Sequence, residues 1–309
     1  MRPPRDSTRT HPGRIVVDGL TKQFGAARAV DDLSFTVEAG TVTGFLGPNG
    51  AGKTTTLRML LGLVAPTSGT ATIGGHRYAE LPRPLTAVGA ALEASGFHKR
   101  RTGRAHLRVL CAAAGLPARR ADEVLTLVGM EPAAGRRVGG YSLGMRQRLG
   151  LAQALLGDPR VLILDEPANG LDPAGIAWLR ELLRSLAASG KTVLVSSHLL
   201  SEVEQTVDDV VIIAGGRSVR QARVADLKAQ AQSGVRVRTP DAGRLVRALR
   251  GAPVRAGAEP GVLLVERVPA ADIGRAALAA GVELHELTPL QSDLQELFLA
   301  LTDGQAGIR

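Results

Sequence analysis

GPNGAGKTT, residues 47–55, is the most informative motif of this 309-residue chain. It fits the pattern G-x-x-x-x-G-K-[ST], in which backbone amides cradle the phosphates of a nucleotide, Lys53 reaches the β- and γ-phosphates and Thr54 coordinates Mg²⁺. A glycine-rich turn that ends in Lys-Thr by chance is the alternative. The flanking residues argue against it, because Thr41–Leu46 predicts an apolar strand and Thr55–Val64 has apolar residues at helical spacing. The glycines therefore precede a helix start, whose dipole and free amides favour an anion.

The predicted phosphate cradle comprises Gly47, Pro48, Asn49, Gly50, Ala51, Gly52, Lys53, Thr54 and Thr55. Its glycines follow the order G-x-x-G-x-G, which differs from the G-x-G-x-x-G of dinucleotide-binding proteins. The cradle thus indicates a nucleoside triphosphate with Mg²⁺ as its ligand.

A second apolar run, VLILD at Val161–Asp165, predicts a strand that ends in the adjacent carboxylates of Asp165 and Glu166. In such a pair, one acid holds Mg²⁺ through water while its neighbour faces a water aimed at the γ-phosphate. An acidic residue at the end of a strand is common, so the pair indicates a functional site only because the phosphate cradle is also present. We expect Asp165 at the metal and Glu166 in the catalytic role.

The segment YSLGMRQR, Tyr141–Arg148, predicts the start of a helix that continues through Leu149, Ala152 and Leu155. Ser142 is placed to cap this helix. Because the N-terminus of a helix attracts anions, the segment is a second candidate phosphate site.

These motifs together resemble those of the ATP-binding subunit of an ABC transporter, over residues 14–219. The matching segments are Gly47–Thr54 (Walker A), Ser142–Gln147 (signature), Leu162–Glu166 (Walker B), Asn169–Asp172 (D-loop) and His198 (switch histidine). The resemblance implies an α/β P-loop NTPase core with a helical signature subdomain at about residues 95–150. It also implies a head-to-tail homodimer that sandwiches two ATP molecules, with Ser142 and Gly144 of one chain meeting the γ-phosphate held by the other.

Three single residues have plainer alternatives. Phe24 lies where the family stacks an aromatic ring on adenine, but it could equally pack in the core of an N-terminal strand. His198 follows the β-prone run Thr192–Ser197 and could be a surface residue; the resemblance implies a catalytic role beside the Walker B acids instead. Asp172, placed by the resemblance at the nucleotide, could also cap the helix that begins at Pro173.

Two motifs, the signature and the Q-loop, depart from the commonest family pattern. Leu143 and Met145 replace the Gly and Gln that are frequent in the signature. Glu93 stands where the Q-loop glutamine is usual, so it either ligates Mg²⁺ or weakens the site by repelling the γ-phosphate. Both substitutions resemble the drug and antibiotic exporter branch, of the ABC-2 type.

The composition fits an ATPase that has no membrane spans of its own. Cys111 is the only cysteine, so an intrachain disulfide is impossible and a reducing compartment is expected. No apolar run approaches the ~18 residues that a spanning helix needs. Residues 1–13 lack a signal-peptide pattern and are expected to form a flexible tail. We therefore expect a peripheral protein on the cytoplasmic face of the membrane, acting with a separate transmembrane permease.

The net charge of +9 is concentrated in the expected helical subdomain, where residues 95–150 carry eleven Lys or Arg against three acidic residues. In the family, this subdomain receives the membrane subunit, and a positive surface there could also face anionic lipid. A solvated charged face is the plain alternative. A nucleic-acid footprint would show interleaved aromatic residues, and the segment does not, so no nucleic acid is expected as a partner.

Residues 220–309 have a pattern of their own and are expected to form a C-terminal accessory domain. Small strands alternate with helices in the order βαββαβ, which suggests a ferredoxin-like α+β unit. The predicted elements are Val235–Arg238, Ala242–Arg250, Val254–Ala256, Val262–Val265, Ala270–Ala280, Glu283–Leu287 and a last helix at Asp293–Leu301. Several prolines, Pro289 among them, are expected to separate these elements.

The sequence thus predicts the ATP-hydrolysing subunit that powers export of a drug, an antibiotic or another amphipathic compound through a membrane partner. The ATPase of a nutrient importer is the nearest alternative, and Glu93 and the YSLGM signature argue against it. A soluble ABC-type ATPase acting on nucleic acid is more distant. Such proteins usually carry two cassettes or a long coiled-coil insertion, whereas this chain has one cassette and no heptad run. Nothing in the sequence identifies the transported compound.

Overall fold

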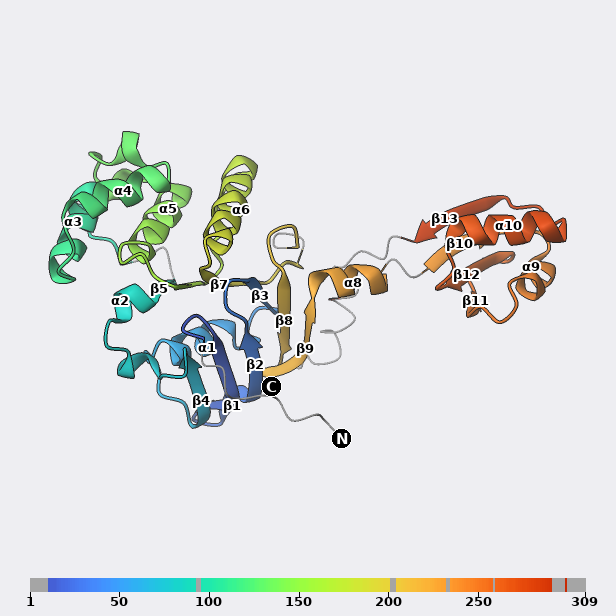
Figure 1. Cartoon of the computed structure of the whole chain (residues 1–309), viewed down its shortest axis with the longest axis horizontal. Helices are drawn as coiled ribbons and strands as arrows, with labels where there is room; N and C mark the ends of the chain where they lie inside the picture. The colour runs from blue at the N-terminus through green and yellow to red at the C-terminus, as the bar shows by residue number, and fades with distance from the viewer. Residues whose placement is uncertain are drawn as a thin grey trace. The chain divides into compact units, whose positions relative to one another are not determined.

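The computed structural model describes residues 11–92, 96–200, 204–231, 234–257, 259–290 and 298. The chain forms two compact units that divide between Ala222 and Arg223 (Figure 1).

The first unit is built on a six-stranded sheet with the order β5-β6-β7-β3-β8-β9. Its strands are β3 (Val42–Leu46), β5 (Val88–Ala91), β6 (Val161–Leu164), β7 (Thr192–Ser197), β8 (Asp209–Ala214) and β9 (Arg217–Arg223). The first five of these strands pair in parallel. β3, β6 and β7 are buried along their whole length, which explains why they read as continuous apolar runs in the sequence.

A smaller antiparallel sheet with the order β2-β1-β4 packs beside the P-loop helix α1 (Lys53–Leu60). Its strands are β1 (Ile15–Phe24), β2 (Ala27–Val37) and β4 (Ser68–Ile73). The two sheets share one hydrophobic core, in which the rings of Phe35 and Phe45 lie 5.1 Å apart between centroids. This core fixes the strand-to-helix turn that carries the cradle.

The expected helical subdomain is present and consists of three helices that pack on one another (Figure 1). They are α3 (Gly103–Ala113), α4 (Arg119–Leu127) and α5 (Leu143–Ala154), with the short helix α2 (Pro84–Ala87) preceding β5. A fourth long helix, α6 (Pro173–Ala188), follows β6. Ser142 caps α5 and Asp172 caps α6, as the sequence predicts for both.

The second unit contains α8 (Val224–Ala231) and a four-stranded antiparallel sheet with the order β11-β12-β10-β13. The sheet and its two helices comprise β10 (Gly234–Arg238), α9 (Ala242–Ala248), β11 (Val254–Ala256), β12 (Val262–Glu266), α10 (Ala270–Ala280) and β13 (Glu286–Leu290). The element order is the predicted βαββαβ. Alternate residues of the strands, such as Val235 and Val237, pack against Leu245 of α9 and Ile273 of α10.

The last strand of this unit corrects one prediction. We expect a strand over Glu283–Leu287 that ends before Pro289, but β13 runs through Pro289, which pairs with Val235. β13 is an edge strand, where proline is tolerated because a missing amide there costs no hydrogen bond within the sheet. The helix predicted over Asp293–Leu301 lies outside the described residues, apart from Phe298.

Candidate functional site

Three neighbouring strand ends bring the predicted motifs together. β6, β7 and β3 are adjacent and parallel, so the residues that follow them lie at one edge of the sheet. The cradle after β3 therefore meets Asp165 and Glu166 after β6, and His198 after β7.

Two glycines allow the cradle to approach the rest of the chain closely. Gly52 has a φ of 97°, and a Cβ there would lie 2.5 Å from the carbonyl oxygen of Ala29. A Cβ on Gly47 would lie 2.5 Å from the carbonyl oxygen of Ile213. α1 begins at Lys53 without a side-chain cap, so its first backbone amides are available to an anion.

The remaining cradle residues form the turn itself. The amide of Ala51 donates a 3.1 Å hydrogen bond to the carbonyl of Pro48. Asn49 and Gly50 are exposed at the tip, and Thr55 is half-buried in the first turn of α1. The loop thus presents backbone groups to solvent at the point where a nucleotide would enter.

Lys53 points into the site from a buried position, with 7% of its side chain exposed. Its Nζ donates to the carbonyl of Gly47 at 2.6 Å and to that of Pro48 at 3.3 Å. The same atom lies 3.4 Å from Oε1 of Glu166. The ammonium group is therefore held by oxygen atoms, and phosphate oxygens are the same kind of partner.

Asp165 is hydrogen-bonded to the start of α1 and to the end of the neighbouring strand β7. Thr54 Oγ1 donates to Asp165 Oδ2 at 2.6 Å, and Ser196 Oγ donates to Asp165 Oδ1 at 2.5 Å. Because Asp165 is 8% exposed, these bonds fix its carboxylate in one orientation. The hydroxyl of Thr54 and the carboxylate of Asp165 thus form an oxygen pair beside the cradle.

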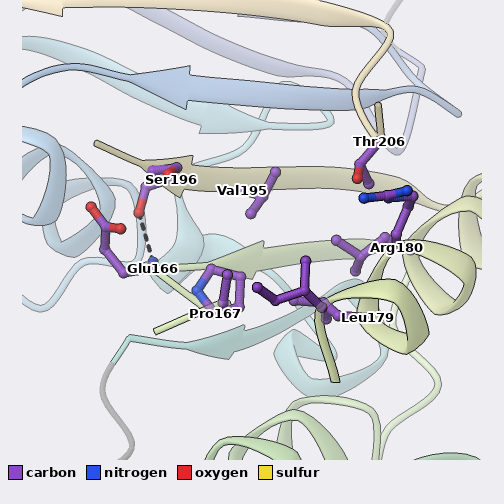
Figure 2. A pocket seen from close by; sticks show the side chains of 11 residues that line it. Glu166, Pro167, Leu179, Arg180, Val195, Ser196 and Thr206 are labelled. Atoms are coloured by element: carbon purple, nitrogen blue, oxygen red, sulfur yellow. Dashed lines mark hydrogen bonds between the residues drawn. The ribbon is translucent and has the colours of Figure 1, made fainter. Parts of the chain in front are cut away.

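Glu166 and His198 also meet. Glu166 has a φ of 47°, an uncommon left-handed conformation for a residue with a side chain, and its amide donates to Ser196 Oγ at 2.9 Å (Figure 2). His198 Nδ1 lies 2.9 Å from Glu166 Oε2. The Glu166 carboxylate is therefore positioned between Lys53 on one oxygen and His198 on the other.

Ser196 is a site residue that the sequence argument missed. It is fully buried, and its hydroxyl bonds Asp165 and the backbone of Glu166 together. The available signal was a hydroxyl residue at the buried end of a strand two positions before His198. Hydroxyl residues at strand ends are common, so the pattern identifies Ser196 only when β6 and Asp165 are known to lie beside it.

The signature residues lie at the start of α5. Ser142 is exposed, and its Oγ accepts a 3.2 Å hydrogen bond from the amide of Met145. A Cβ on Gly144 would lie 3.3 Å from Leu171 Cδ2, so this turn packs against the D-loop segment. Within the described residues, no hydrogen bond joins Ser142 to Lys53.

Phe24 and Asp172 have simple surroundings. Phe24 ends β1 with 52% of its surface exposed, which excludes the alternative of core packing, and Lys22 Nζ lies 4.9 Å from its ring centroid. Asp172 accepts a 2.7 Å hydrogen bond from the amide of Gly175, so it caps α6.

Glu93 lies outside the described residues. In the part of the chain that is described, no group of three or more His, Cys, Asp or Glu side chains is placed to hold a metal ion. A divalent ion at this site would therefore depend on Thr54, on Asp165 and on oxygen atoms of a bound nucleotide.

Comparison with known proteins defines the family. Residues 30–169 match the family model described as "ABC transporter". The chain is 46% identical to the bacitracin transport ATP-binding protein BcrA of Bacillus licheniformis, over 69% of this chain and 71% of that protein. It is 35% identical to the daunorubicin resistance ATP-binding protein DrrA3 of Streptomyces coeruleorubidus, over 96% and 98%. The chain belongs to the ATP-binding subunits of ABC transporters, which hydrolyse ATP to power transport.

A solved structure agrees. The chain superimposes on one titled "Structure of ATP binding subunit of ABC transporter" with a TM-score of 0.63 and 31% identity, over 70% of this chain and 92% of that one. Residues 233–295 match a second family model, described as "Domain of unknown function (DUF8746)". Among the described residues, no helix is long and apolar enough to cross a membrane.

Proposed function

We propose that this ATPase powers the export of a drug, an antibiotic or another amphipathic compound through a separate membrane permease. The observation that carries its ATPase chemistry is the position of Glu166, which lies between Lys53 and His198 at the mouth of the cradle. Export is supported by a relative named for daunorubicin resistance, and an antibiotic as the transported compound is supported by a relative named for bacitracin transport.

The cradle would bind the triphosphate of ATP. The free amides at the start of α1 face the phosphates, and Lys53 exchanges its carbonyl partners for β- and γ-phosphate oxygens. Phe24 has an exposed ring that is available to stack on adenine.

Mg²⁺ fits the oxygen pair of Thr54 and Asp165. Mg²⁺ is usually held by one or two carboxylates together with substrate phosphates, and the two oxygens here lie 2.6 Å apart beside the cradle. Ser196 holds the second carboxylate oxygen, so that Oδ2 of Asp165 stays directed at Thr54. A bound ion would neutralise negative charge on the phosphates.

Glu166 would orient or deprotonate the attacking water. Its left-handed backbone and the bond from its amide to Ser196 turn the side chain toward the cradle. His198 contacts Oε2 and keeps the carboxylate in place, while Oε1 lies near Lys53. The chain thus supplies a positioned acceptor for the proton that the water loses.

The second half of each site would come from another copy of the chain. Ser142 and Gly144, which we call the signature half-site, lie on an exposed helix start that suits an anion. Lys53, Thr54, Asp165 and Glu166 form the Walker half-site. In a head-to-tail dimer, the signature half-site of one copy closes over ATP held by the Walker half-site of its partner, with Asp172 at the same interface.

The membrane permease would dock beside the helical subdomain. Lys99, Arg100 and Arg101 are exposed and make no ion pair within the described residues, whereas Arg104 Nε pairs with Asp122 Oδ1 at 2.6 Å. By sequence position, Lys99, Arg100, Arg101 and Arg104 are all candidates for docking, but the ion pair with Asp122 engages Arg104. We call the remaining three the basic patch.

The function is tested by expressing the chain with the membrane protein encoded beside its gene in drug-sensitive bacteria. Growth inhibition by bacitracin, daunorubicin and other amphipathic compounds is then measured. Export predicts raised resistance to at least one compound, and Glu166→Gln abolishes it. Accumulation of a nutrient with no change in resistance would instead support the importer.

A further inference from the structure

The start of α5 is packed directly on the segment that links β6 to α6. Gln147 Nε2 of α5 donates to the carbonyl of Asn169 at 3.2 Å. Gly170 has a φ of 77°, and a Cβ there would lie 2.1 Å from Leu143 Cδ2. The signature turn therefore has no room to move toward this segment without displacing it.

The next residue of α5 after Gln147 is Arg148, which contacts α6. The guanidinium carbon of Arg148 lies 3.9 Å from the ring centroid of Trp178 on α6, a cation–π stack. Arg148 Nη1 also donates to the carbonyl of Val128 at 3.0 Å, at the C-terminal end of α4. A single side chain thus joins α4, α5 and α6.

This stack lies close to the catalytic strand. Arg148 and Trp178 line a small cavity together with Leu164, the last residue of β6, and Pro167, which follows Glu166. The stack is therefore next to the backbone that positions Asp165 and Glu166, and a movement of the stack would act on that backbone. In an ATP-bridged dimer, α5 touches the nucleotide of one site while β6 serves the other.

We propose that Arg148 and Trp178 are positioning residues that couple the two ATP sites of the dimer. The inference rests on the proposed function, because it requires the signature half-site to act in trans. Occupation of the signature half-site shifts α5, and the stack transmits the shift to α6 and to the segment after Glu166. Each chain then senses the nucleotide held by its partner.

The steady-state ATPase rate of the chain, assembled with its permease, is measured against ATP concentration. Wild type should show a Hill coefficient above about 1, and Trp178→Leu and Arg148→Met should bring it to about 1. ATP binding to the Walker half-site, measured by calorimetry, should stay within about twofold of wild type. Trp178→Phe should retain cooperativity, because it keeps an aromatic face for Arg148. Arg119→Met is the matched control, since this arginine is 82% exposed on α4.

Trp178 is the only tryptophan of the chain, so its fluorescence reports on the stack directly. Mg-ATP should change its emission in Glu166→Gln dimers and change it less when Arg148→Met is added. The positioning role would be overturned if Trp178→Leu kept the Hill coefficient of wild type, or if it lost ATP binding together with cooperativity. Either result would leave the proposed function intact. If instead Glu166→Gln stays monomeric with ATP, the proposed dimer fails, and the coupling fails with it.

Discussion

The Walker half-site and the signature half-site differ in how completely their own chain surrounds them. Lys53 and Asp165 are buried, and hydrogen bonds or ion pairs link them to Thr54, Glu166 and Ser196. Ser142 is exposed, and its hydroxyl is used to cap its own helix.

The Walker half-site is thus held in place by its own chain, whereas the signature half-site is open to solvent; under the proposed function, the first is the catalytic half and the second binds the ATP of a partner. A buried carboxylate needs partners before any ligand arrives, because an unpaired charge away from water is costly. At an exposed helix start, water satisfies the free backbone amides until an anion binds.

The largest effect is expected at the Walker half-site. Glu166→Gln should lower kcat by about 10²- to 10⁴-fold, because it removes the general base, while ATP binding persists. Lys53→Ala should instead weaken ATP binding itself, since the cation at the phosphates is lost. Calorimetry and phosphate release separate the two effects, and Glu181→Gln, at an exposed position of α6, is the control. Turnover near the wild-type rate in Glu166→Gln would refute the assignment.

A complementation assay tests whether the signature half-site acts in trans. A double variant, Ser142→Ala with Gly144→Val, has a defective signature half-site and should not hydrolyse ATP at an appreciable rate by itself. Asp165→Asn has a defective Walker half-site and should be equally inactive by itself. Mixed together, the two variants should regain activity, because each heterodimer contains about one intact composite site. A site contained in a single chain predicts no recovery at any mixing ratio.

A smaller effect is expected at the basic patch. Each exposed charge near an anionic surface contributes about 1 kcal/mol at most, so Lys99, Arg100 and Arg101 must all be changed to Glu to weaken recruitment. Copurification with the permease at physiological salt should fall, while ATP binding is unchanged. Arg119→Glu is the matched control. Wild-type copurification of the triple variant would show that the patch is a solvated face.

The smallest effect concerns Asp122, which lies between two arginines of α3. Hydrogen bonds from Arg108 and Arg104 hold the pKa of its carboxyl below the ordinary value of 3.8. Its folded-state pKa is therefore depressed, so its stabilisation is present above pH 3.8 and is lost as pH falls through the folded value. Asp122→Asn should lower Tm slightly at pH 7, and the difference should vanish in acid. Because the ion pairs are exposed, the loss is small.

The sequence predicted the parts of the fold that depend on local pattern. Strands such as Val161–Leu164 are buried on both faces and read as apolar runs, and the caps Ser142 and Asp172 follow from side-chain chemistry. Contacts between distant segments were not predictable in this way. Ser196 with Asp165 and Arg148 with Trp178 depend on which strands and helices become neighbours. Because of Pro289, the last strand was predicted to end too early; an edge strand tolerates a proline that a central strand does not.

The proposed function requires each chain to complete the ATP site of another copy. Sedimentation velocity of the Glu166→Gln chain, with and without Mg-ATP, tests it most directly, because blocked hydrolysis keeps ATP in the sandwich. The chain should be a monomer without nucleotide and a dimer with Mg-ATP, and Gly144→Val should abolish the dimer. A monomer at saturating Mg-ATP, or a dimer that ignores both ATP and Gly144→Val, would contradict it.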